Sequence, residues 1–136
     1  MKYLLDTDTC IYWFKGAEKI KEGVKRVGEE NLAISIITIG ELKYGAYYSK
    51  KVEENLEKLS NFLRKVEIVN LDEENIDQYG KSKADLRRQE CLIEDFDLLN
   101  ASIALSNGWT LVTNNIKHYA RIGHLKFENW IEENIV

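Results

Sequence analysis

Four polar residues spread along nearly the whole chain are the candidates for chemistry in this sequence. They are Asp6, Glu41, Asp97 and Asn115. Asp6 directly follows an apolar run at residues 1–5, which predicts a short buried strand with the acid at its carboxyl end. In open α/β sheets the ligand crevice lies at the carboxyl ends of the strands, so an acid at this position is placed for chemistry.

The other three candidates are expected to reach the same edge of a sheet. Glu41 begins the helix after a second predicted strand, and Asn115 follows a fourth. Asp97 starts the helix that leads into that fourth strand, where it shares one helical face with Ala101 and Ala104. The small alanine side chains would let this helix approach the sheet closely and turn Asp97 toward the crevice.

Each candidate also has an ordinary structural explanation. Asp6 can cap the helix that follows it, and Thr38-x-x-Glu41 matches a capping box with Thr38 as N-cap. Asp97 lies in the first turn of its helix, where the macrodipole favours any carboxylate. Asn115 fits a turn. Taken singly these explanations stay open, whereas the convergence of all four residues at one edge favours a site.

A cluster of three carboxylates has a direct electrostatic consequence. Carboxylates within a few ångströms of one another repel and shift toward the protonated form unless a cation neutralises them. Oxygen ligands without a Cys or His cluster select Mg²⁺, for which Mn²⁺ can substitute. A hydrated Mg²⁺ held by carboxylates suits hydrolysis of a phosphodiester. The residue types therefore predict a metal-assisted hydrolase.

The elements that must position these acids alternate between strand and helix. Apolar runs predict strands at residues 1–5, 31–36, 67–71 and 110–113, with a short fifth at 126–128. Helical periodicity and caps predict helices at 9–14, 17–27, 38–48, 51–66, 72–88 and 95–107. This alternation implies an α/β fold with three layers, in which helices flank a mostly parallel sheet of four or five strands.

Length and composition bound the class of protein. The chain has 136 residues, 44% of them hydrophobic and 31% charged, which predicts a single domain over residues 1–136. No apolar run approaches the roughly 20 residues of a membrane span and no signal-peptide pattern is present, so we expect a cytoplasmic protein. A net charge of −4 argues against a DNA-coating protein but is compatible with a nuclease.

The cysteine and histidine content disfavours zinc. Cys10 and Cys91 lie far apart in the sequence and form no CxxC pair, so two reduced thiols are expected. His118 and His124 are the only histidines.

Five blocks of sequence resemble a known family in order and over nearly the whole chain. The blocks are Leu4-Leu5-Asp6-Thr7, Ile34-Ser35-x-x-Thr38-x-x-Glu41-Leu42-x-x-Gly45, Ile93-x-x-x-Asp97-x-Leu99-x-Ala101, Leu111-Val112-Thr113-x-Asn115 and Leu125-Lys126-Phe127-Glu128-Asn129-Trp130. Together they are similar to PIN-domain proteins, specifically the VapC toxins of VapBC toxin–antitoxin systems.

The resemblance implies a Mg²⁺-dependent endoribonuclease of a type II toxin–antitoxin pair. Its catalytic acids and metal ligands would be Asp6, Glu41 and Asp97. The fourth catalytic position falls on Asn115, where the family often has Asp, so the amide adds no negative charge and can orient water or substrate. Candidates to orient the carboxylates through hydrogen bonds are Thr7, Ser35 and Thr113.

Two positions depart from the family pattern, and one further acid lies nearby. Asp8 stands where Asn is usual, and Asn100 stands where an aliphatic residue is common. Asp95 adds an acid near the expected pocket. For Asp8 and Asp95 a solvated or capping role is expected, with a share in the pocket's charge as the alternative.

The resemblance also implies a homodimer and a cognate VapB antitoxin. The antitoxin tail would lie across the apolar first helices and push a basic residue into the acidic pocket. Tyr12, Trp13 and Phe14 fit such a groove, and ordinary core packing explains them about as well.

An RNA substrate requires positive charge around the site. The candidates for phosphate contact are Lys43, Lys50, Lys51, Lys81, Lys83, Arg87 and Arg88. Tyr44, Tyr47 and Tyr48 can stack bases, although packing at a dimer or core surface is the preferred interpretation.

Two alternatives compete with the nuclease interpretation. Asp6-x-Asp8-x-Cys10 resembles the DxDx[TV] signature of haloacid-dehalogenase-type phosphatases, but Cys10 replaces Thr or Val and no basic residue with a downstream Asp pair completes the set. The other alternative is a catalytically silent PIN module that binds RNA or an antitoxin, which the amide at Asn115 keeps open.

Overall fold

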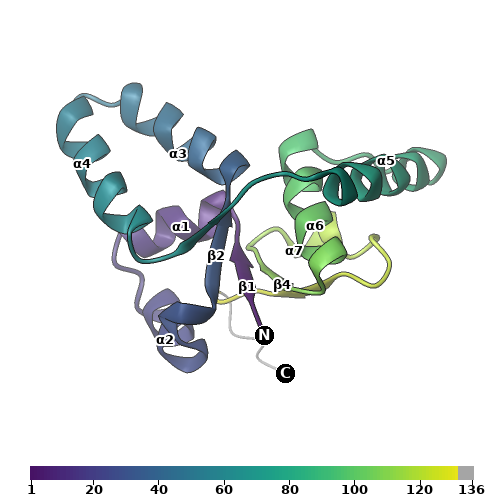
Figure 1. Cartoon of the computed structure of the whole chain (residues 1–136), viewed down its shortest axis with the longest axis horizontal. Helices are drawn as coiled ribbons and strands as arrows, with labels where there is room; N and C mark the ends of the chain where they lie inside the picture. The colour runs from purple at the N-terminus through teal and green to yellow at the C-terminus, as the bar shows by residue number, and fades with distance from the viewer. Residues whose placement is uncertain (132–136) are drawn as a thin grey trace.

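Five parallel strands form the sheet that positions the candidate residues. The computed structural model describes residues 1–131. Within them the strands lie in the order β3-β2-β1-β4-β5 (Figure 1). The strands are β1 (Tyr3–Leu5), β2 (Leu32–Ser35), β3 (Glu67–Val69), β4 (Thr110–Val112) and β5 (Lys126–Glu128). Every adjacent pair is parallel, so the α/β class and the short fifth strand predicted from the sequence are confirmed.

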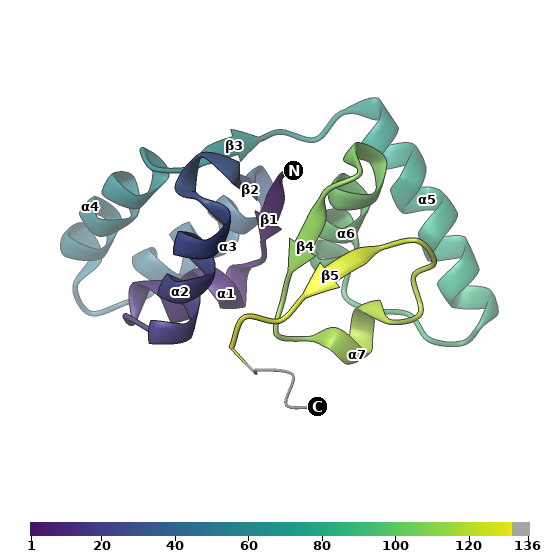
Figure 2. The ribbon, with the colours of Figure 1, turned by 90° about the horizontal axis from the view of Figure 1, so that it is seen from below.

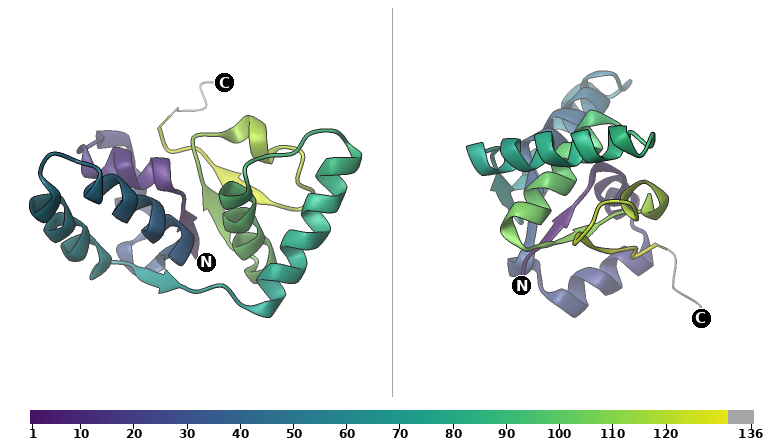
Figure 3. Two further views of the ribbon diagram at one scale, coloured as in Figure 1. Left: turned by 90° about the horizontal axis from the view of Figure 1, so that it is seen from above. Right: turned by 90° about the vertical axis from the view of Figure 1, so that its right-hand side faces the viewer.

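Helices cover both faces of this sheet, which confirms the three-layer prediction. In Figure 2, α1 to α4 lie on one side of the strands and α5 to α7 lie on the other. Helix α5 packs along α6, as both views of Figure 3 show. The helices are α1 (Thr7–Phe14), α2 (Glu18–Val27), α3 (Ile36–Tyr47), α4 (Val52–Leu63), α5 (Glu73–Arg88), α6 (Asp95–Asn107) and α7 (Ile116–Tyr119).

Side chains that alternate along the strands supply two separate cores. Leu5 and Val112 pack with residues of α1 to α4 on one face. Leu4 and Leu111 pack with residues of α5, α6 and α7 on the other face. Because successive strand residues point to opposite faces, a strand covered on both sides reads as a continuous apolar run. This is why the central strands were recognisable in the sequence.

The order of the strands places a crevice beside β1. The chain runs outward from β1 to β2 and β3, and then returns to the other side of β1 to form β4. The Asp6 amide donates to the Val112 carbonyl at 3.1 Å, so the two strands are joined up to their carboxyl ends. Ligands of open α/β sheets bind where the strand order reverses in this way, and here that point lies between β1 and β4.

Three helix boundaries differ from the sequence prediction by two or more residues. Helix α1 begins at Thr7 rather than Thr9, because Asp6 is its N-cap. Helix α3 begins at Ile36, because the Ser35 hydroxyl accepts from the Thr38 amide at 3.2 Å and so caps the helix in place of Thr38. Helix α4 ends at Leu63 rather than at residue 66.

Two short elements are absent from the sequence prediction. They are the 3₁₀ turn Glu29–Asn31 and the one-turn helix α7. Both are too short to show a helical period. No helix within residues 1–131 has the length and apolar character needed to cross a membrane.

The segment after β5 packs back onto α2 through Trp130. The indole lies 6.0 Å from the Tyr3 ring, and the Arg26 guanidinium lies 5.6 Å from the indole ring. A Cβ added at Gly23 would come within 2.5 Å of this indole. Gly23 therefore lets a bulky aromatic side chain contact the backbone of α2 directly.

This contact gives opposite predictions for two helical glycines. Gly80 in α5 is exposed, and a Cβ there would meet nothing within 4 Å. We expect Gly80→Ala to raise the free energy of unfolding by about 0.5–1 kcal/mol, since alanine is the better helix former. We expect Gly23→Ala to lower it, because overpacking costs about 1–3 kcal/mol. Urea denaturation measures both, and equal stabilisation by the two variants would contradict the packing described for Trp130.

Candidate active site

All four sequence candidates line one small pocket at the carboxyl ends of β1 and β4. We call this cavity of about 210 Å³ the acidic pocket. Its lining comes from helices α1, α3 and α6 and from the residues just before α1, α6 and α7, and consists of Asp6, Thr7, Asp8, Glu41, Glu94, Phe96, Asp97 and Asn115. The structure thus brings together residues that lie far apart in the sequence, as the strand-edge argument predicted.

Asp6 is the most deeply placed of the acids. Its side chain accepts from the Thr9 amide at 2.9 Å, so the predicted capping role is confirmed and coexists with the position in the pocket. Burial raises the pKa of Asp6, and hydrogen bonds from Thr113 and Thr9 oppose that rise. A carboxylate only 4% exposed is therefore held in place by donors from two segments of chain.

Glu41 projects from α3 toward the first turn of α1. The Thr7 hydroxyl donates to Glu41 Oε1 at 2.6 Å. Because Ser35 caps α3, Glu41 lies beyond the first turn, and the capping-box explanation for this residue is wrong. The hydrogen bond ties the Glu41 carboxylate to the first turn of α1.

Asp97 occupies the first turn of α6, and its chemistry is set by the other acids. Burial, and then the charges of Asp6 and Glu41, raise the pKa of Asp97 to about 6. His118 on α7 lies 3.9 Å from the Asp97 carboxylate and partly offsets that rise. The raised pKa therefore reflects burial first, and then the repulsion among the carboxylates that the sequence predicts.

Asn115 and Thr113 extend the pocket from the end of β4. The backbone N–H of Asn115 donates to the Thr113 hydroxyl at 3.0 Å. The Thr113 side chain in turn forms a hydrogen bond with Asp6. Asn115 stands at the N-cap of α7, but its side chain makes no capping hydrogen bond. Its amide group therefore lines the pocket as a neutral polar group.

Ser35, which was expected to orient a carboxylate, and Asp95, for which a share in the pocket's charge was the alternative, lie elsewhere. The Ser35 hydroxyl donates to Asn100, whose amide donates to Thr38 at 3.2 Å, so this buried network joins α3 to α6. Asp95 turns away from the pocket and binds Tyr79 and Lys83 at 2.7 and 2.9 Å. The hydrogen bonds of Ser35 serve the packing of two helices, and Asp95 holds α6 to α5.

The structure adds residues that the sequence reasoning missed. Glu94 and Phe96 line the pocket in place of Asp95, because the rotation of α6 turns these neighbours inward. His118 and Tyr119 approach Asp97 from α7. Among these residues only His118, one of the two histidines in the chain, stands out in the sequence, and a single histidine is too weak a signal to mark a site.

Carboxylate oxygens are the main donors that the acidic pocket offers to a divalent cation. Within residues 1–131, no three Asp, Glu, His or Cys side chains lie close enough together to enclose a metal ion directly. The pocket nevertheless offers oxygen donors from several carboxylates, and burial together with the charges of the other acids raises the pKa of Asp97. Mg²⁺ is typically held by one or two carboxylates and keeps several waters. The residues present fit such a hydrated ion.

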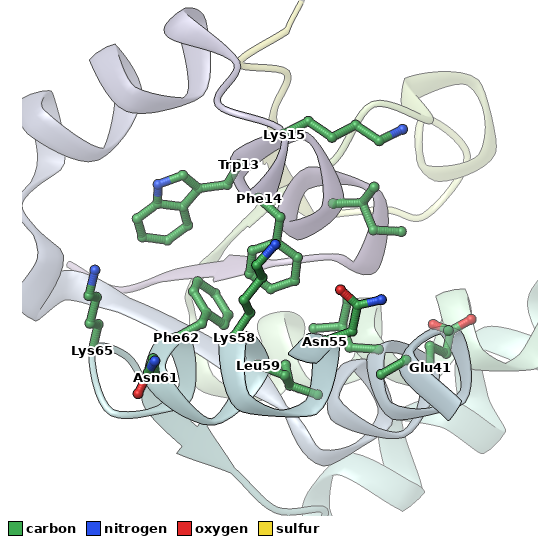
Figure 4. Close-up of a pocket in the computed structure, with 14 residues that line it drawn as sticks. Trp13, Phe14, Lys15, Glu41, Asn55, Lys58, Leu59, Asn61, Phe62 and Lys65 are labelled. Atoms are coloured by element: carbon green, nitrogen blue, oxygen red, sulfur yellow. The ribbon is translucent and has the colours of Figure 1, made fainter. Parts of the chain in front are cut away.

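A second and larger cavity lies between α1 and the α3–α4 pair. We call this space of about 740 Å³ the apolar groove. Figure 4 shows Trp13 and Phe14 of α1 facing Phe62 of α4, and Lys15, Lys58 and Lys65 are also among the lining residues. The rings of Trp13 and Phe14 meet that of Phe62 edge-on, with centroids 5.1 and 4.7 Å apart. Glu41 lines this groove as well as the acidic pocket.

The basic residues considered for phosphate contact lie outside the acidic pocket. Four of them form surface ion pairs, namely Lys51 with Glu54, Lys81 with Asp77, Lys83 with Asp95, and Arg88 with Asp85. Such exposed pairs contribute little to stability. The exposed side chains of Tyr44 in α3 and Tyr48 just after it stack on each other, with ring centroids 5.9 Å apart.

Comparison with known proteins agrees with this geometry. The PIN domain family model matches residues 3–125. Ribonuclease VapC2 of Rickettsia felis is 39% identical over 132 residues, covering 96% of this chain and 98% of that protein. The tRNA(fMet)-specific endonuclease VapC of Salmonella typhimurium is 34% identical over 131 residues, covering 96% and 98%.

Solved structures give the same result. VapBC2 from Rickettsia felis, bound to a DNA fragment from its promoter, matches with a TM-score of 0.90 at 39% identity, covering 96% of this chain and 99% of that chain. DNA-bound VapBC from Salmonella typhimurium matches with a TM-score of 0.90 at 34% identity, covering 96% and 98%. The chain belongs to the PIN-domain family, among the VapC proteins.

Proposed function

We propose that this protein is a Mg²⁺-dependent endoribonuclease and the toxin of a type II toxin–antitoxin pair. The observation that carries the proposal is the meeting of Asp6, Glu41 and Asp97 in the acidic pocket. The names of the relatives, ribonuclease and tRNA(fMet)-specific endonuclease, support RNA as the substrate. They favour neither the phosphatase alternative nor a catalytically silent module.

The metal site of the proposed enzyme is formed by the three acids. Asp6 and Asp97 would hold the ion, and Glu41 would hold it directly or through water. Mn²⁺ can replace Mg²⁺ in such a site. A bound Mg²⁺ supplies Lewis acidity toward the phosphoryl oxygen and lowers the pKa of its water.

The remaining pocket residues keep these carboxylates in position and shape the approach of the substrate. Thr113 and the Thr9 amide fix Asp6, and Thr7 fixes Glu41. Asn115 provides an amide that can orient water or a phosphate oxygen without adding charge. Phe96 gives one wall of the pocket an apolar surface.

A VapB-type antitoxin that occupies the apolar groove belongs to the same proposal. The solved relatives are VapBC complexes. In this chain the groove is lined by aromatic side chains, and Glu41 joins it to the acidic pocket. A basic residue at the end of a tail in the groove would meet the acids there. We further propose that the toxin is a homodimer and that residues 1–136 form one domain.

The first test removes one metal-binding acid at a time. We expect Asp6→Asn and Asp97→Asn each to abolish Mg²⁺-dependent RNA cleavage, with a loss of at least about 100-fold, because each removes a charge from the metal site. Cleavage of a labelled RNA in Mg²⁺, Mn²⁺ or EDTA measures the effect. Asp8→Asn is the matched control, since exposed Asp8 lines the same pocket, and it should lose little activity.

Binding of the ion is checked without any substrate. Mg²⁺ should raise the melting temperature of the wild-type protein more than that of Asp6→Asn, because a ligand of the folded state stabilises that state. Full cleavage by both single variants would refute the assignment. Loss of cleavage in Asp8→Asn equal to that in Asp6→Asn would instead point to the phosphatase chemistry.

The raised pKa of Asp97 predicts a pH-dependent cost in the metal-free protein. Its pKa is about 6 in the folded state against an ordinary 3.8. The folded state therefore binds this proton more tightly, and the ionised carboxylate destabilises the fold above about pH 6 but not below about pH 4. Asp97→Asn should raise the free energy of unfolding by about 1–3 kcal/mol near pH 7.5.

That gain should vanish as the pH is lowered to about 4. Urea denaturation with EDTA at both pH values measures it, and Glu22→Gln on the exposed side of α2 serves as the control. A gain in stability of the same size at both pH values would show that ionisation of Asp97 is not the cause of the gain.

The antitoxin proposal is tested in the groove itself. Phe14→Glu places a charge among the apolar residues of the groove, whereas Ile76→Glu places one at a similarly exposed site on α5. We expect Phe14→Glu to lose at least about tenfold in affinity for a coexpressed VapB-type antitoxin, because burying the charge is unfavourable. Copurification with tagged antitoxin measures this. Undiminished binding by Phe14→Glu would exclude the groove as the docking site.

A further inference from the structure

Tyr119 is a polar side chain in an otherwise apolar core. It is 0% exposed and packs among the residues of the core that includes Leu4, Leu98 and Leu111. Its hydroxyl is buried and makes no hydrogen bond to any atom of residues 1–131. Buried hydroxyl groups in proteins almost always have a partner, since leaving one unpaired costs stability. Phenylalanine would fill the same space without that cost.

The Tyr119 hydroxyl lies close enough to the acids of the site to feel their charges. Burial, and then the negative charges of Asp97 and Asp6, raise the pKa of Tyr119 well above its ordinary value. The phenol is therefore protonated across the working pH range and can act as a donor. Helix α7 follows directly after Asn115, so the same segment that lines the acidic pocket carries Tyr119 close to Asp97.

Asp97 is the one of the three acids that makes no hydrogen bond of good geometry within residues 1–131. The Tyr119 hydroxyl lies close enough to interact with it weakly, since a side-chain interaction with Asp97 adds to the effect of burial on the pKa of Tyr119. Asp6 accepts from Thr9 and Thr113, and Glu41 accepts from Thr7. His118 Nδ1 lies 3.9 Å from the Asp97 carboxylate, which is beyond hydrogen-bond distance. An acceptor without a well-placed donor therefore lies beside a buried donor without a well-placed acceptor.

We propose that Tyr119 is a positioning residue whose hydroxyl donates to the ionised Asp97 carboxylate and holds it in the orientation that binds the metal. The inference rests on the proposed function, since it assigns Asp97 to the metal site. It gives each of the three acids a hydroxyl donor: Thr113 for Asp6, Thr7 for Glu41 and Tyr119 for Asp97.

The test compares two tyrosine variants that each remove a hydroxyl facing an acid. Tyr119→Phe removes the donor to Asp97. Tyr79→Phe removes a hydroxyl that lies 2.7 Å from Asp95, outside the acidic pocket, and is the matched control. Mg²⁺ affinity is measured by calorimetry in the absence of RNA. We expect about a 10-fold weaker affinity for Tyr119→Phe, the loss typical of residues that orient metal ligands, and no change for Tyr79→Phe.

RNA cleavage separates positioning from substrate binding. Tyr119→Phe should lower kcat and raise the half-saturating Mg²⁺ concentration while leaving KM for RNA unchanged. If wild type binds Mg²⁺ and Tyr119→Phe binds it with the same affinity, the inference is overturned and the proposed function stands. If wild type itself binds no Mg²⁺ and cleaves no RNA, the proposed function fails.

A metal-free cycle tests the pairing even in that case. The urea midpoint is compared for wild type, Tyr119→Phe, Asp97→Asn and the double variant near pH 7.5. We expect Tyr119→Phe to lower the midpoint in the wild-type background by more than in the Asp97→Asn background, because only the former loses a bond to an ionised carboxylate. Equal shifts in the two backgrounds would reduce Tyr119 to a packing role and overturn the proposal.

Discussion

The repulsion among the carboxylates of the acidic pocket is the constraint on which the rest of the structure depends. Asp6, Glu41 and Asp97 come from three separate segments and are held near one another in a partly buried space. Nothing in their own chemistry favours that proximity without a cation. The two hydrophobic cores on the faces of the sheet must therefore supply the energy that keeps the acids together. A stable scaffold is thus a precondition for a site that opposes its own assembly.

The strand order explains how a small fold achieves this arrangement. The reversal of strand order beside β1 leaves the carboxyl ends of β1 and β4 open to a ligand. Helices α1 and α7 begin within a few residues of those ends. Asp6 serves both requirements at once, since it caps α1 and forms the floor of the pocket. A single side chain therefore couples local helix formation to the geometry of the site. Loss of its oxygen atoms would affect both.

Much of the fold and part of the site follow from local patterns in the sequence. Apolar runs that end at a polar residue gave the first four strands, and the order of the acids along the chain gave the pocket. The start of α3 did not follow, because Ser35 and Thr38 are equally good caps and tertiary pairing of β2 with β3 decides between them. The Ser35–Asn100 contact joins distant positions and leaves no local signal.

Rotation of a helix about its axis is a second quantity that the sequence does not specify. Asp95 and Glu94 both stand at the start of α6, and packing against α5 decides which of them faces the pocket. The one-turn helix α7 has too few residues to show periodicity. Its contributions to the site, His118 and Tyr119, become visible only when the chain is folded.

Glu41 lies in the wall shared by the acidic pocket and the apolar groove, and this placement has a thermodynamic consequence. Two ligands that share one wall residue are energetically coupled whenever either of them moves or neutralises it. By linkage the coupling is reciprocal, so the factor by which an occupant of the groove changes the affinity for a cation equals the factor by which the cation changes the affinity for that occupant. The metal content of the solution is then a variable in every measurement of partner binding.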